Sequence, residues 1–333
     1  MAVYTQLGAE ALGSIIAEFD VGRLVSAKGI AEGVSNSNWL IETDGQGAHC
    51  PPHAGNARFI LTMYEQRTEV AELPFFLGLL DHLAACGCPV PRTIHDRDNR
   101  AFRLHQGKAL ALIEFLPGVS VSMPTSAQAQ AVGAALAQVH LAAADFPYTR
   151  ANGLGLAGWQ DLARACTTAG LAGIDPPLGN LVEHELAQLA AQWPADLPRS
   201  VIHADLFPDN VLMLGEAVTG LIDFYFACTD ITAYDVAVTH AAWCFSTDGW
   251  EFHRDLSDAL LAGYAAVRPL SGAERAALPL LARGAAMRFL LTRAYDWMNT
   301  PAGALVTRKD PLAFARRLEF YAAPHNATIF AES

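Results

Sequence analysis

A polar loop in the second half of the chain combines side chains that can move a proton and hold a metal ion. The segment from His203 to Asn210 reads HADLFPDN, and Asp223 follows thirteen residues beyond Asn210. A carboxylate such as that of Asp205 can accept the proton of a hydroxyl group. Asn210 and Asp223 offer an amide oxygen and a second carboxylate, which are oxygen ligands of the kind that magnesium prefers. The segment therefore predicts a site where a hydroxyl group reacts beside a magnesium ion.

Apolar segments on both sides of this loop would hold its polar side chains in place. Residues 200–202 are predicted to form a buried strand, residues 210–214 a second strand, and residues 221–222 a third strand that ends at Asp223. A turn at Gly215 joins the second strand to the third. Because each polar side chain then lies at a strand end, we expect all three to gather at one place.

The spacing of these residues is that of phosphoryl-transfer enzymes. His203, Asp205 and Asn210 follow the H-x-D-x-x-x-x-N spacing of the protein kinase catalytic loop. Asp223 and Phe224 lie where those enzymes have Asp-Phe-Gly. In this interpretation Asp205 accepts the proton of the attacking hydroxyl, while the other two oxygen ligands hold magnesium. An ordinary surface turn is the alternative interpretation, and the flanking apolar strands favour the site.

The loop and several further segments resemble a known family of small-molecule kinases. HADLFPDN followed by IDF, without the glycine of Asp-Phe-Gly, is similar to the aminoglycoside phosphotransferase and choline kinase superfamily. Finer matches resemble the bacterial homoserine kinase branch of that superfamily, and the resemblance covers residues 1–321. The segments that carry the finer match are HADLFPDNV, GLIDFYFACTD, YDVAV, GIAEGVSNSNW and RFLLTRAYDW.

The resemblance implies an α+β, protein kinase-like fold with two lobes. Residues 1–113 would form an N-terminal lobe, in which a small antiparallel sheet and a helix cover the nucleotide. Residues 114–118 would be the hinge, where the backbone around Glu114 and Leu116 resembles the segment that binds adenine. Residues 119–333 would form a mostly helical C-terminal lobe that carries the catalytic and metal-binding loops.

Helical spacing of apolar residues is expected in two segments of the first lobe and in several of the second. His140, within one of the latter, is expected to be a packed core histidine. The segments predicted to be helical are residues 7–19, 73–85, 125–144, 159–169, 181–192, 233–244, 254–267, 272–298 and 311–321.

Residues 30–37, IAEGVSNS, lie between two predicted strands, which is the plan of a kinase phosphate-covering loop. Gly33 would let the backbone approach the phosphates. Ser35, Asn36 and Ser37 would offer side-chain or backbone hydrogen-bond donors. A plain hairpin with a single glycine is the alternative interpretation.

The next predicted strand, residues 58–64, lacks the lysine that pairs the nucleotide phosphates in protein kinases. Aligning FILT with the V-A-I-K pattern places Thr62 at that position. Lys28, directly before the glycine-containing loop, is our candidate for a compensating phosphate contact, with Arg67 behind it. A solvated surface lysine is the alternative interpretation of Lys28.

The resemblance implies a reaction and its substrates. ATP and magnesium would phosphorylate the hydroxyl of L-homoserine, giving O-phospho-L-homoserine in threonine biosynthesis. His203 and Asp235 would support the catalytic loop, although Asp235 also fits the first turn of a helix. Because homoserine carries both an ammonium and a carboxylate, its pocket should supply opposite charges. The candidates for that pocket are Asp209, Tyr225, Asp230, Arg288 and Arg293.

The residues also leave other substrates and another class of function open. Choline, methylthioribose, fructosamine and aminoglycosides are acceptors in the same superfamily. Choline would need an aromatic cage, for which Tyr225, Phe226 and Trp243 are candidates. The missing strand lysine at Thr62 suggests a non-catalytic nucleotide-binding pseudokinase, while the retained Asp205 and metal ligands favour catalysis.

Composition excludes several further classes of protein. The chain has 333 residues, 52% of them hydrophobic and 17% charged, which is typical of a globular protein with room for two lobes. A net charge of −12 argues against nucleic acid or an anionic membrane as a partner. Six scattered cysteines and an N-terminus without signal-peptide features favour the cytoplasm. The sequence does not predict the oligomeric state.

An insertion at residues 44–57 separates two predicted strands. Its residues His49, Cys50 and His53 lack the spacing of a zinc site. A solvated insertion is the expectation, and no function is predicted for it.

Overall fold

The structure, a computed structural model, describes residues 7–30, 36–50, 55–65, 69–300 and 308–331. The chain divides into two compact units, Met1–Pro117 and Gly118–Ser333. This division falls within the segment 114–118 that was expected to be the hinge. In the described residues, no helix is long and apolar enough to cross a membrane.

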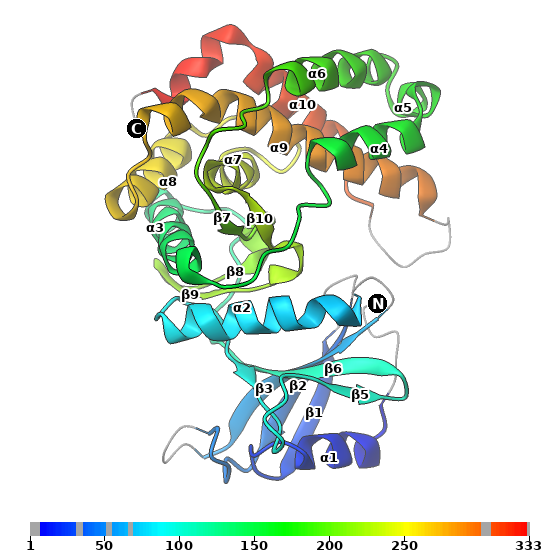
Figure 1. Cartoon of the computed structure of the whole chain (residues 1–333), viewed down its shortest axis with the longest axis vertical. Helices are drawn as coiled ribbons and strands as arrows, with labels where there is room; N and C mark the ends of the chain where they lie inside the picture. The colour runs from blue at the N-terminus through cyan, green and yellow to red at the C-terminus, as the bar shows by residue number, and fades with distance from the viewer. Residues whose placement is uncertain (1–6, 31–35, 51–54, 66–68, 301–307, 332–333) are drawn as a thin grey trace. The chain divides into compact units, whose positions relative to one another are not determined.

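The first unit is built on an antiparallel sheet whose described strands number six (Figure 1). The strand order is β1-β2-β3-β6-β4, and β5 pairs with β6. The strands are β1 (Leu24–Ile30), β2 (Asn36–Thr43), β3 (Ala57–Tyr64), β4 (Thr93–Ile94), β5 (Arg103–His105) and β6 (Lys108–Glu114). In this register Lys28 lies opposite Leu40, and Asn38 lies opposite Thr62.

Helix α1 (Ala9–Ala17) covers one face of this sheet. Its residues Ile15 and Ile16 share a buried cluster with Trp39 and Ile41 of β2 and with alternate residues of β3. Because side chains alternate between the two faces of a strand, residues 38, 40 and 62 point to the face opposite α1. Figure 1 shows α1 and α2 (Leu73–Ala85) on opposite sides of the sheet.

Helix α2 has the bounds that the sequence predicted, and it is joined to β4 by polar contacts. The carboxylate of Asp81 accepts a hydrogen bond from the Thr93 backbone N–H at 3.1 Å and lies 2.7 Å from His95 Nε2. Phe75 and Phe76 are buried on this helix.

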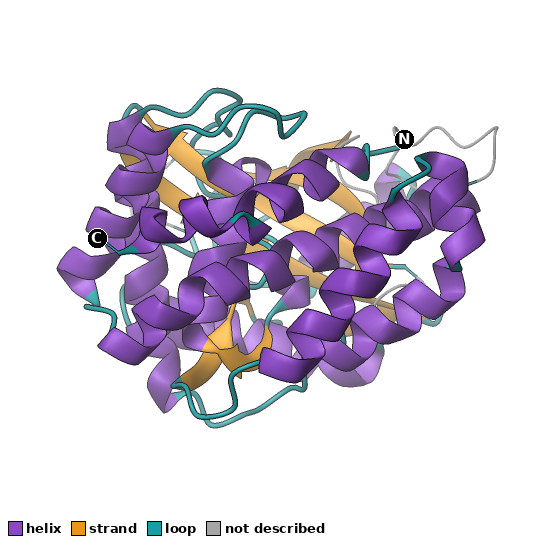
Figure 2. Ribbon diagram, turned by 90° about the horizontal axis from the view of Figure 1, so that it is seen from above, coloured by secondary structure: helices purple, strands orange, loops and turns teal. Residues whose placement is uncertain are grey.

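The second unit is mostly helical, as Figures 1 and 2 show. Helix α7 is buried along its whole length, and the other helices surround it. Capping boxes at Thr125 and Ser271 start α3 and α9. The helices are α3 (Ser126–Ala142), α4 (Leu156–Cys166), α5 (Thr168–Ile174), α6 (Leu178–Gln192), α7 (Thr232–Trp243), α8 (Arg254–Val267), α9 (Gly272–Asn299) and α10 (Leu312–Ala322).

Two small antiparallel sheets carry the catalytic segment. Strand β7 (Arg199–Ile202) pairs with β10 (Cys228–Ile231), and β8 (Val211–Leu214) pairs with β9 (Ala217–Leu221). Strand β10 was not predicted from the sequence. The predicted third strand was misplaced, because the strand covers Ala217–Leu221 and ends before Ile222.

The described part of the 44–57 insertion packs on the segment that follows α1. The thiol of Cys50 lies 3.3 Å from the carbonyl oxygen of Val21, and the His49 N–H donates to Asp20 O at 3.1 Å. Cys50 also contacts the core cluster under the sheet. This part is therefore anchored, whereas a solvated loop was expected. His53 lies outside the described residues.

Candidate active site

The HADLFPDN loop is fastened to α7 by the carboxylate of Asp235. The loop starts where β7 ends, and Ala204 adopts a left-handed backbone with φ of 63°. The N–H groups of His203 and Ala204 each donate to an Asp235 oxygen at 2.7 Å. Asp235 is fully buried, and such an acceptor is what these two buried N–H groups require. The carboxylate thereby stabilises the unusual backbone of the loop.

His140 of α3 orients that carboxylate. Its Nε2 lies 3.0 Å from Asp235 Oδ2, and its Nδ1 lies 2.8 Å from the hydroxyl of Tyr264 on α8. Burial alone would raise the pKa of Asp235, but the hydrogen bond and the charge from His140 lower it below its ordinary value. The sequence analysis treated His140 only as a packed core residue and missed this role. Its partners lie 95 and 124 residues away, so no local pattern marks it.

Asp205 carries the carboxylate expected to act as the base. Its side chain is 18% exposed, and the Asn210 amide nitrogen donates to its backbone oxygen at 2.8 Å and to its carboxylate at 3.3 Å. Burial raises the pKa of Asp205 to about 7; Arg288 opposes this rise and Asp223 adds to it. A carboxylate with a pKa close to neutral pH is suited to accept a proton and later release it.

Asp223 lies next to Asn210 because a further backbone hydrogen bond extends the pairing of β8 and β9 to the residues that flank the two strands. The Ile222 N–H donates to Asn210 O at 3.0 Å, and the Ile222 carbonyl lies 2.9 Å from His203 Nε2. Asp223 has a left-handed backbone with φ of 64°. Burial raises its pKa to about 6, and the charge of Asp209 adds to the rise. The predicted acid, amide and second acid are thus neighbours in space.

This set of oxygen atoms fits a magnesium ion. Two neighbouring carboxylates with raised pKa values are electrostatically unfavourable together, and a cation between them would relieve the repulsion. The Asn210 amide nitrogen already donates to Asp205, so its amide oxygen is the atom suited to ligate a metal. In the described part of the chain, no group of three or more His, Cys, Asp or Glu side chains could hold a metal. The amide oxygen of Asn210 and the carboxylate of Asp223 are the predicted ligands.

Two of the acidic candidates for the substrate pocket have very different surroundings. Asp209 is 66% exposed and lies 3.7 Å from the ammonium of Lys309. Asp230 is buried on β10, where Asn152 donates to it at 2.7 Å and Arg199 lies 3.2 Å away. Its carboxylate is therefore committed to holding segments of the protein together.

The two arginine candidates also differ. Arg288 is 1% exposed, donates to the backbone oxygen of Ala204, and lies 3.9 Å from Asp205. Arg293 is half-buried, and its Nη1 donates to Asp310 O at 3.2 Å. Arg288 thus supports the catalytic loop directly, while Arg293 keeps some surface accessible. Sequence reasoning missed Lys309, whose ammonium lies 5.7 Å from the Phe207 ring of the loop.

Aromatic candidates for a choline cage are only partly available to a ligand. Trp243 is buried, and its indole N–H donates to Leu206 O at 2.9 Å. Phe226 is 43% exposed, with the Arg288 guanidinium 5.4 Å from its ring. Tyr225 is half-buried beside Phe226 in the turn that follows Asp223. A cage that includes Trp243 is therefore not formed.

In the first unit, four of the residues predicted to contact the nucleotide lie on the paired strands β1, β2 and β3: Lys28, Asn36, Ser37 and Thr62. Lys28 is exposed, and it shares the sheet face opposite α1 with Thr62. The hydroxyl of Thr62 donates to Asn38 Oδ1 at 2.9 Å, so this position now carries a neutral hydrogen bond. Asn36 Oδ1 accepts the Glu65 N–H at 3.4 Å.

Ser37 and the hinge have partners of their own. The Ser37 hydroxyl donates to Glu65 at 2.8 Å, and Lys108 also lies 2.5 Å from that carboxylate. Glu114 forms two contacts of 3.1 and 3.2 Å with the Arg92 guanidinium, and its N–H donates to Arg92 O at 2.9 Å. Leu116 is half-buried. Three of the residues predicted to contact the nucleotide lie outside the described residues: Gly33, Ser35 and Arg67.

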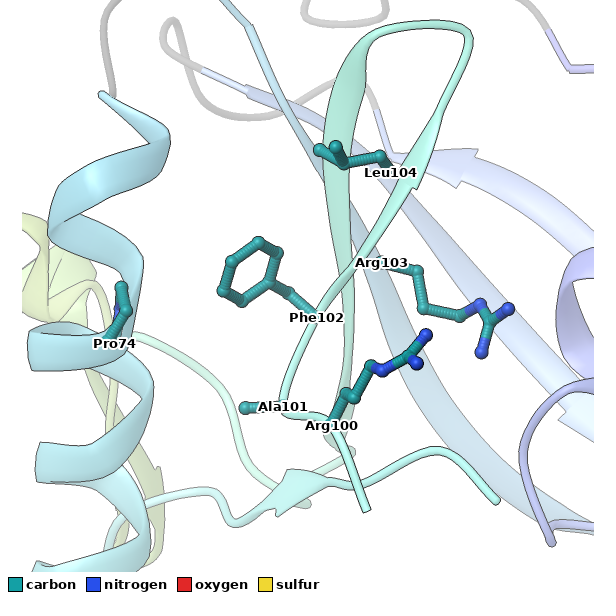
Figure 3. Close-up of a pocket in the computed structure, with 6 residues that line it drawn as sticks. All are labelled: Pro74, Arg100, Ala101, Phe102, Arg103 and Leu104. Atoms are coloured by element: carbon teal, nitrogen blue, oxygen red, sulfur yellow. The ribbon is translucent and has the colours of Figure 1, made fainter. Parts of the chain in front are cut away.

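A separate groove of about 610 Å³ lies in the first unit (Figure 3). Its lining comes from Pro74 of α2 and from residues 100–104. None of the predicted site residues lines it. Arg103 on its border is held by Asp96 at 2.5 Å and by Glu18 at 3.3 Å.

Comparison with known proteins identifies the family. The model of the phosphotransferase enzyme family (APH) matches residues 26–270. A homoserine kinase of Azorhizobium caulinodans is 50% identical over 98% of both chains, and one of Methylobacterium radiotolerans is 49% identical over 98% of both. The chain belongs to the phosphotransferase enzyme family, in its homoserine kinase branch. The family expected from the sequence is therefore confirmed.

Solved structures confirm the expected fold class of this phosphotransferase. An amicoumacin kinase in complex with AMP-PNP, Ca²⁺ and its antibiotic has a TM-score of 0.68 and 14% identity, covering 95% of this chain and 93% of its own. A choline kinase from Cryptosporidium parvum has a TM-score of 0.67 and 14% identity, covering 97% of this chain and 100% of its own. At these identities the likeness shows the protein kinase-like α+β fold alone.

Proposed function

We propose that the protein transfers the terminal phosphate of ATP to the hydroxyl of L-homoserine, giving ADP and O-phospho-L-homoserine for threonine biosynthesis. The observation that carries this proposal is the position of Asp205, with a raised pKa, beside Asn210 and Asp223. Relatives named homoserine kinase, about half identical over nearly the whole chain, support the choice of acceptor.

Asp205 accepts the proton of the homoserine hydroxyl as its oxygen attacks the terminal phosphorus atom. The hydroxyl oxygen forms the new P–O bond while the bond to the ADP oxygen breaks. Asn210 holds the Asp205 carboxylate through its amide N–H, and Arg288 holds the loop through Ala204 O. Magnesium, when bound to Asn210 and Asp223, supplies positive charge to the phosphate oxygens.

The exposed sheet face of the first unit supplies the proposed nucleotide contacts. Lys28 approaches the phosphates and replaces the strand lysine that is absent at Thr62. The other proposed contacts come from the phosphate-covering loop and the hinge. They are Gly33, Ser35, Asn36, Ser37, Glu114 and Leu116. Because the Glu114 N–H donates to Arg92 O, adenine would be read by other backbone groups of this segment.

The homoserine pocket needs one negative and one positive group near Asp205. Asp209, exposed and on the same loop, is the proposed partner of the substrate ammonium, with Tyr225 nearby on the turn after Asp223. Asp230 is left out, because its carboxylate is already bound by Asn152 and Arg199. Free cysteines at all six positions suit a reducing cytoplasm, where the proposed substrates are small metabolites.

The test is ADP release in a coupled assay with ATP and magnesium across four acceptors: L-homoserine, choline, methylthioribose and kanamycin. We expect turnover with L-homoserine at least about a hundredfold more efficient than with the others, because only homoserine offers both charges. Efficient use of choline or kanamycin instead would overturn the proposed acceptor. ATP binding without turnover of any acceptor would favour the pseudokinase hypothesis.

A further inference from the structure

Three arginines of the second unit surround an aromatic cluster of α9 and α10 that contacts Phe207 of the catalytic loop. Arg288, Arg293 and Arg317 each donate hydrogen bonds to main-chain carbonyl oxygens. In the part of the chain that the structure describes, neither Arg293 nor Arg317 has a carboxylate within 4.0 Å, and Arg288 lies 3.9 Å from Asp205. A carbonyl oxygen satisfies a donor but does not neutralise its charge. This wall of the site is therefore suited to an anion.

The three arginines differ in how much of each side chain is exposed to solvent. Arg288 is 1% exposed, between the rings of Phe226 and Phe289, and Arg317 is 4% exposed. Arg293 is half-buried. It is therefore the arginine of the three that a small ligand can reach without rearranging the core.

An aromatic cluster places Arg293 beside the loop. Phe207 lies two residues after Asp205, and its ring centroid is 4.8 Å from that of Phe289 on α9. Phe289 lies 5.1 Å from Phe314 on α10, and the Arg293 guanidinium lies 4.4 Å over the Phe314 ring. Arg293 is one helical turn after Phe289, so both side chains project from the same face of α9.

The electrostatic surroundings agree with this placement. Burial lowers the pKa of Arg293 to about 10, and the charge of Arg317 adds to the fall, while Asp310, Asp205 and Asp209 oppose it. The carboxylates of the loop are thus close enough to influence this guanidinium. A ligand carboxylate would add a direct ion pair, which none of the described carboxylates forms with Arg293 within 4.0 Å.

We propose that Arg293 binds the carboxylate of the amino-acid acceptor and so selects an amino acid over a plain amino alcohol. This inference rests on the proposed function. A guanidinium can form two parallel hydrogen bonds with a carboxylate, which fixes the orientation as well as the position of the substrate. The acceptor hydroxyl then lies towards Asp205. Arg288 remains a positioning residue that holds Ala204 O and takes no part in substrate binding.

The experiment compares two acceptors that differ in the carboxylate alone, L-homoserine and 3-aminopropan-1-ol. Both are assayed with the wild type, Arg293→Gln and Arg293→Lys. Arg316→Gln is the matched control, because Arg316 also stacks at 4.4 Å on an aromatic ring and donates to a carbonyl oxygen. Arg316 has its own carboxylate partner, Asp310, at 3.7 Å.

In Arg293→Gln, kcat/KM for L-homoserine should fall about 10- to 100-fold, mainly through KM, because a charged hydrogen-bond pair is lost. The value for 3-aminopropan-1-ol should change by less than about threefold, since no carboxylate is present to lose a partner. For L-homoserine, the kcat/KM of Arg293→Lys should lie between those of the wild type and Arg293→Gln. Lysine keeps the positive charge but cannot form the two parallel hydrogen bonds of a guanidinium. Arg316→Gln should leave the preference between the two acceptors unchanged.

The outcomes separate this inference from the proposed function. A wild type that does not phosphorylate L-homoserine contradicts the proposed function. A wild type that uses L-homoserine and 3-aminopropan-1-ol equally well contradicts the role of Arg293, as does equal loss with both acceptors in the variants. If Arg293→Gln fails to fold, two results still test the role of Arg293. They are the kcat/KM values of Arg293→Lys and the wild type's ratio of kcat/KM for L-homoserine to that for 3-aminopropan-1-ol.

Discussion

The catalytic loop of the second unit and the sheet of the first unit, which we propose contacts the nucleotide, hold their polar residues in different ways. The loop is tied to the fully buried helix α7, where Asp235 accepts two backbone N–H groups and is itself held by His140. On the sheet, the exposed Lys28 has no such support, and Thr62 makes one hydrogen bond to Asn38. Groups that react need rigid positions, whereas groups that attract phosphates can act over longer distances.

After the proposed base Asp205, the largest effect is expected from Asp223, the proposed metal ligand on the turn after β9. Asp223→Asn should lower kcat by roughly a hundred- to thousandfold, because a negative oxygen ligand is replaced by a neutral one at the centre of charge development. The magnesium concentration that gives half-maximal rate should rise at the same time. Steady-state rates over a magnesium titration measure both. A loss of rate with unchanged magnesium dependence would remove Asp223 from the ligand set.

Breaking the buried support should cost stability as well as rate. Asp235→Asn replaces one of the oxygens that face the His203 and Ala204 N–H groups by a donor and removes the charge beside His140. We expect the free energy of unfolding to fall by about 3 kcal/mol, which urea titration measures. Thr62→Val, in the first unit, should cost less than about 1.5 kcal/mol. Equal losses in the two variants would break the comparison between the units.

His240, a buried histidine of helix α7, should make the stability of the protein depend on pH. Burial lowers the pKa of His240 to about 3, where its nitrogens lie 2.6 Å from Tyr321 OH and 2.9 Å from Ser257 Oγ. Between pH 6.5 and 3 the unfolded chain binds a proton at this residue that the folded chain does not. Stability is therefore full above about pH 6.5 and falls by up to about 1.4 kcal/mol per unit as the pH drops below it.

Urea unfolding of the wild type and His240→Gln at several pH values between 7 and 4.5 measures this dependence. The variant should be less stable at pH 7 and show a shallower decline. Parallel curves for the two proteins would contradict the assignment to His240.

Smaller effects are expected from Tyr264, which supports the catalytic loop through His140, and from Lys28, the proposed phosphate contact. Tyr264→Phe removes the hydroxyl that lies 2.8 Å from His140 Nδ1 and should cost about 1 kcal/mol of stability with a modest fall in kcat.

Lys28→Ala should raise the KM for ATP by roughly three- to tenfold with little change in kcat or stability, because an exposed cation is lost. A large fall in kcat for Lys28→Ala would place Lys28 in the chemical step.

Local patterns in the sequence predicted much of this molecule. The bounds of α2 and α8 follow from apolar spacing and from end signals that lie within a few residues. The loop from His203 to Asn210 was recognised by its spacing, by the apolar strands on both sides and by Asp223 thirteen residues further on. The prediction failed for α5, a short helix of residues 168–174 with two glycines, whose helical propensity is low.

Long-range partners could not be predicted in the same way. Strand β10 exists because it pairs with β7, about thirty residues earlier, and its four residues carry little signal of their own. His140 meets Asp235 from 95 residues away, and Arg288 meets Ala204 from 84 residues away. Such contacts depend on how the helices pack, which no single segment of sequence records.

The most direct test of the central claim is the rate of Asp205→Asn. This change keeps the shape of the side chain and the neighbouring Asn210 but removes the proton acceptor. We predict a fall in kcat of at least about a thousandfold at neutral pH, with the affinities for ATP and L-homoserine, measured by calorimetry, changed by less than about threefold. A kcat within tenfold of the wild type would contradict the assignment of Asp205 as the base.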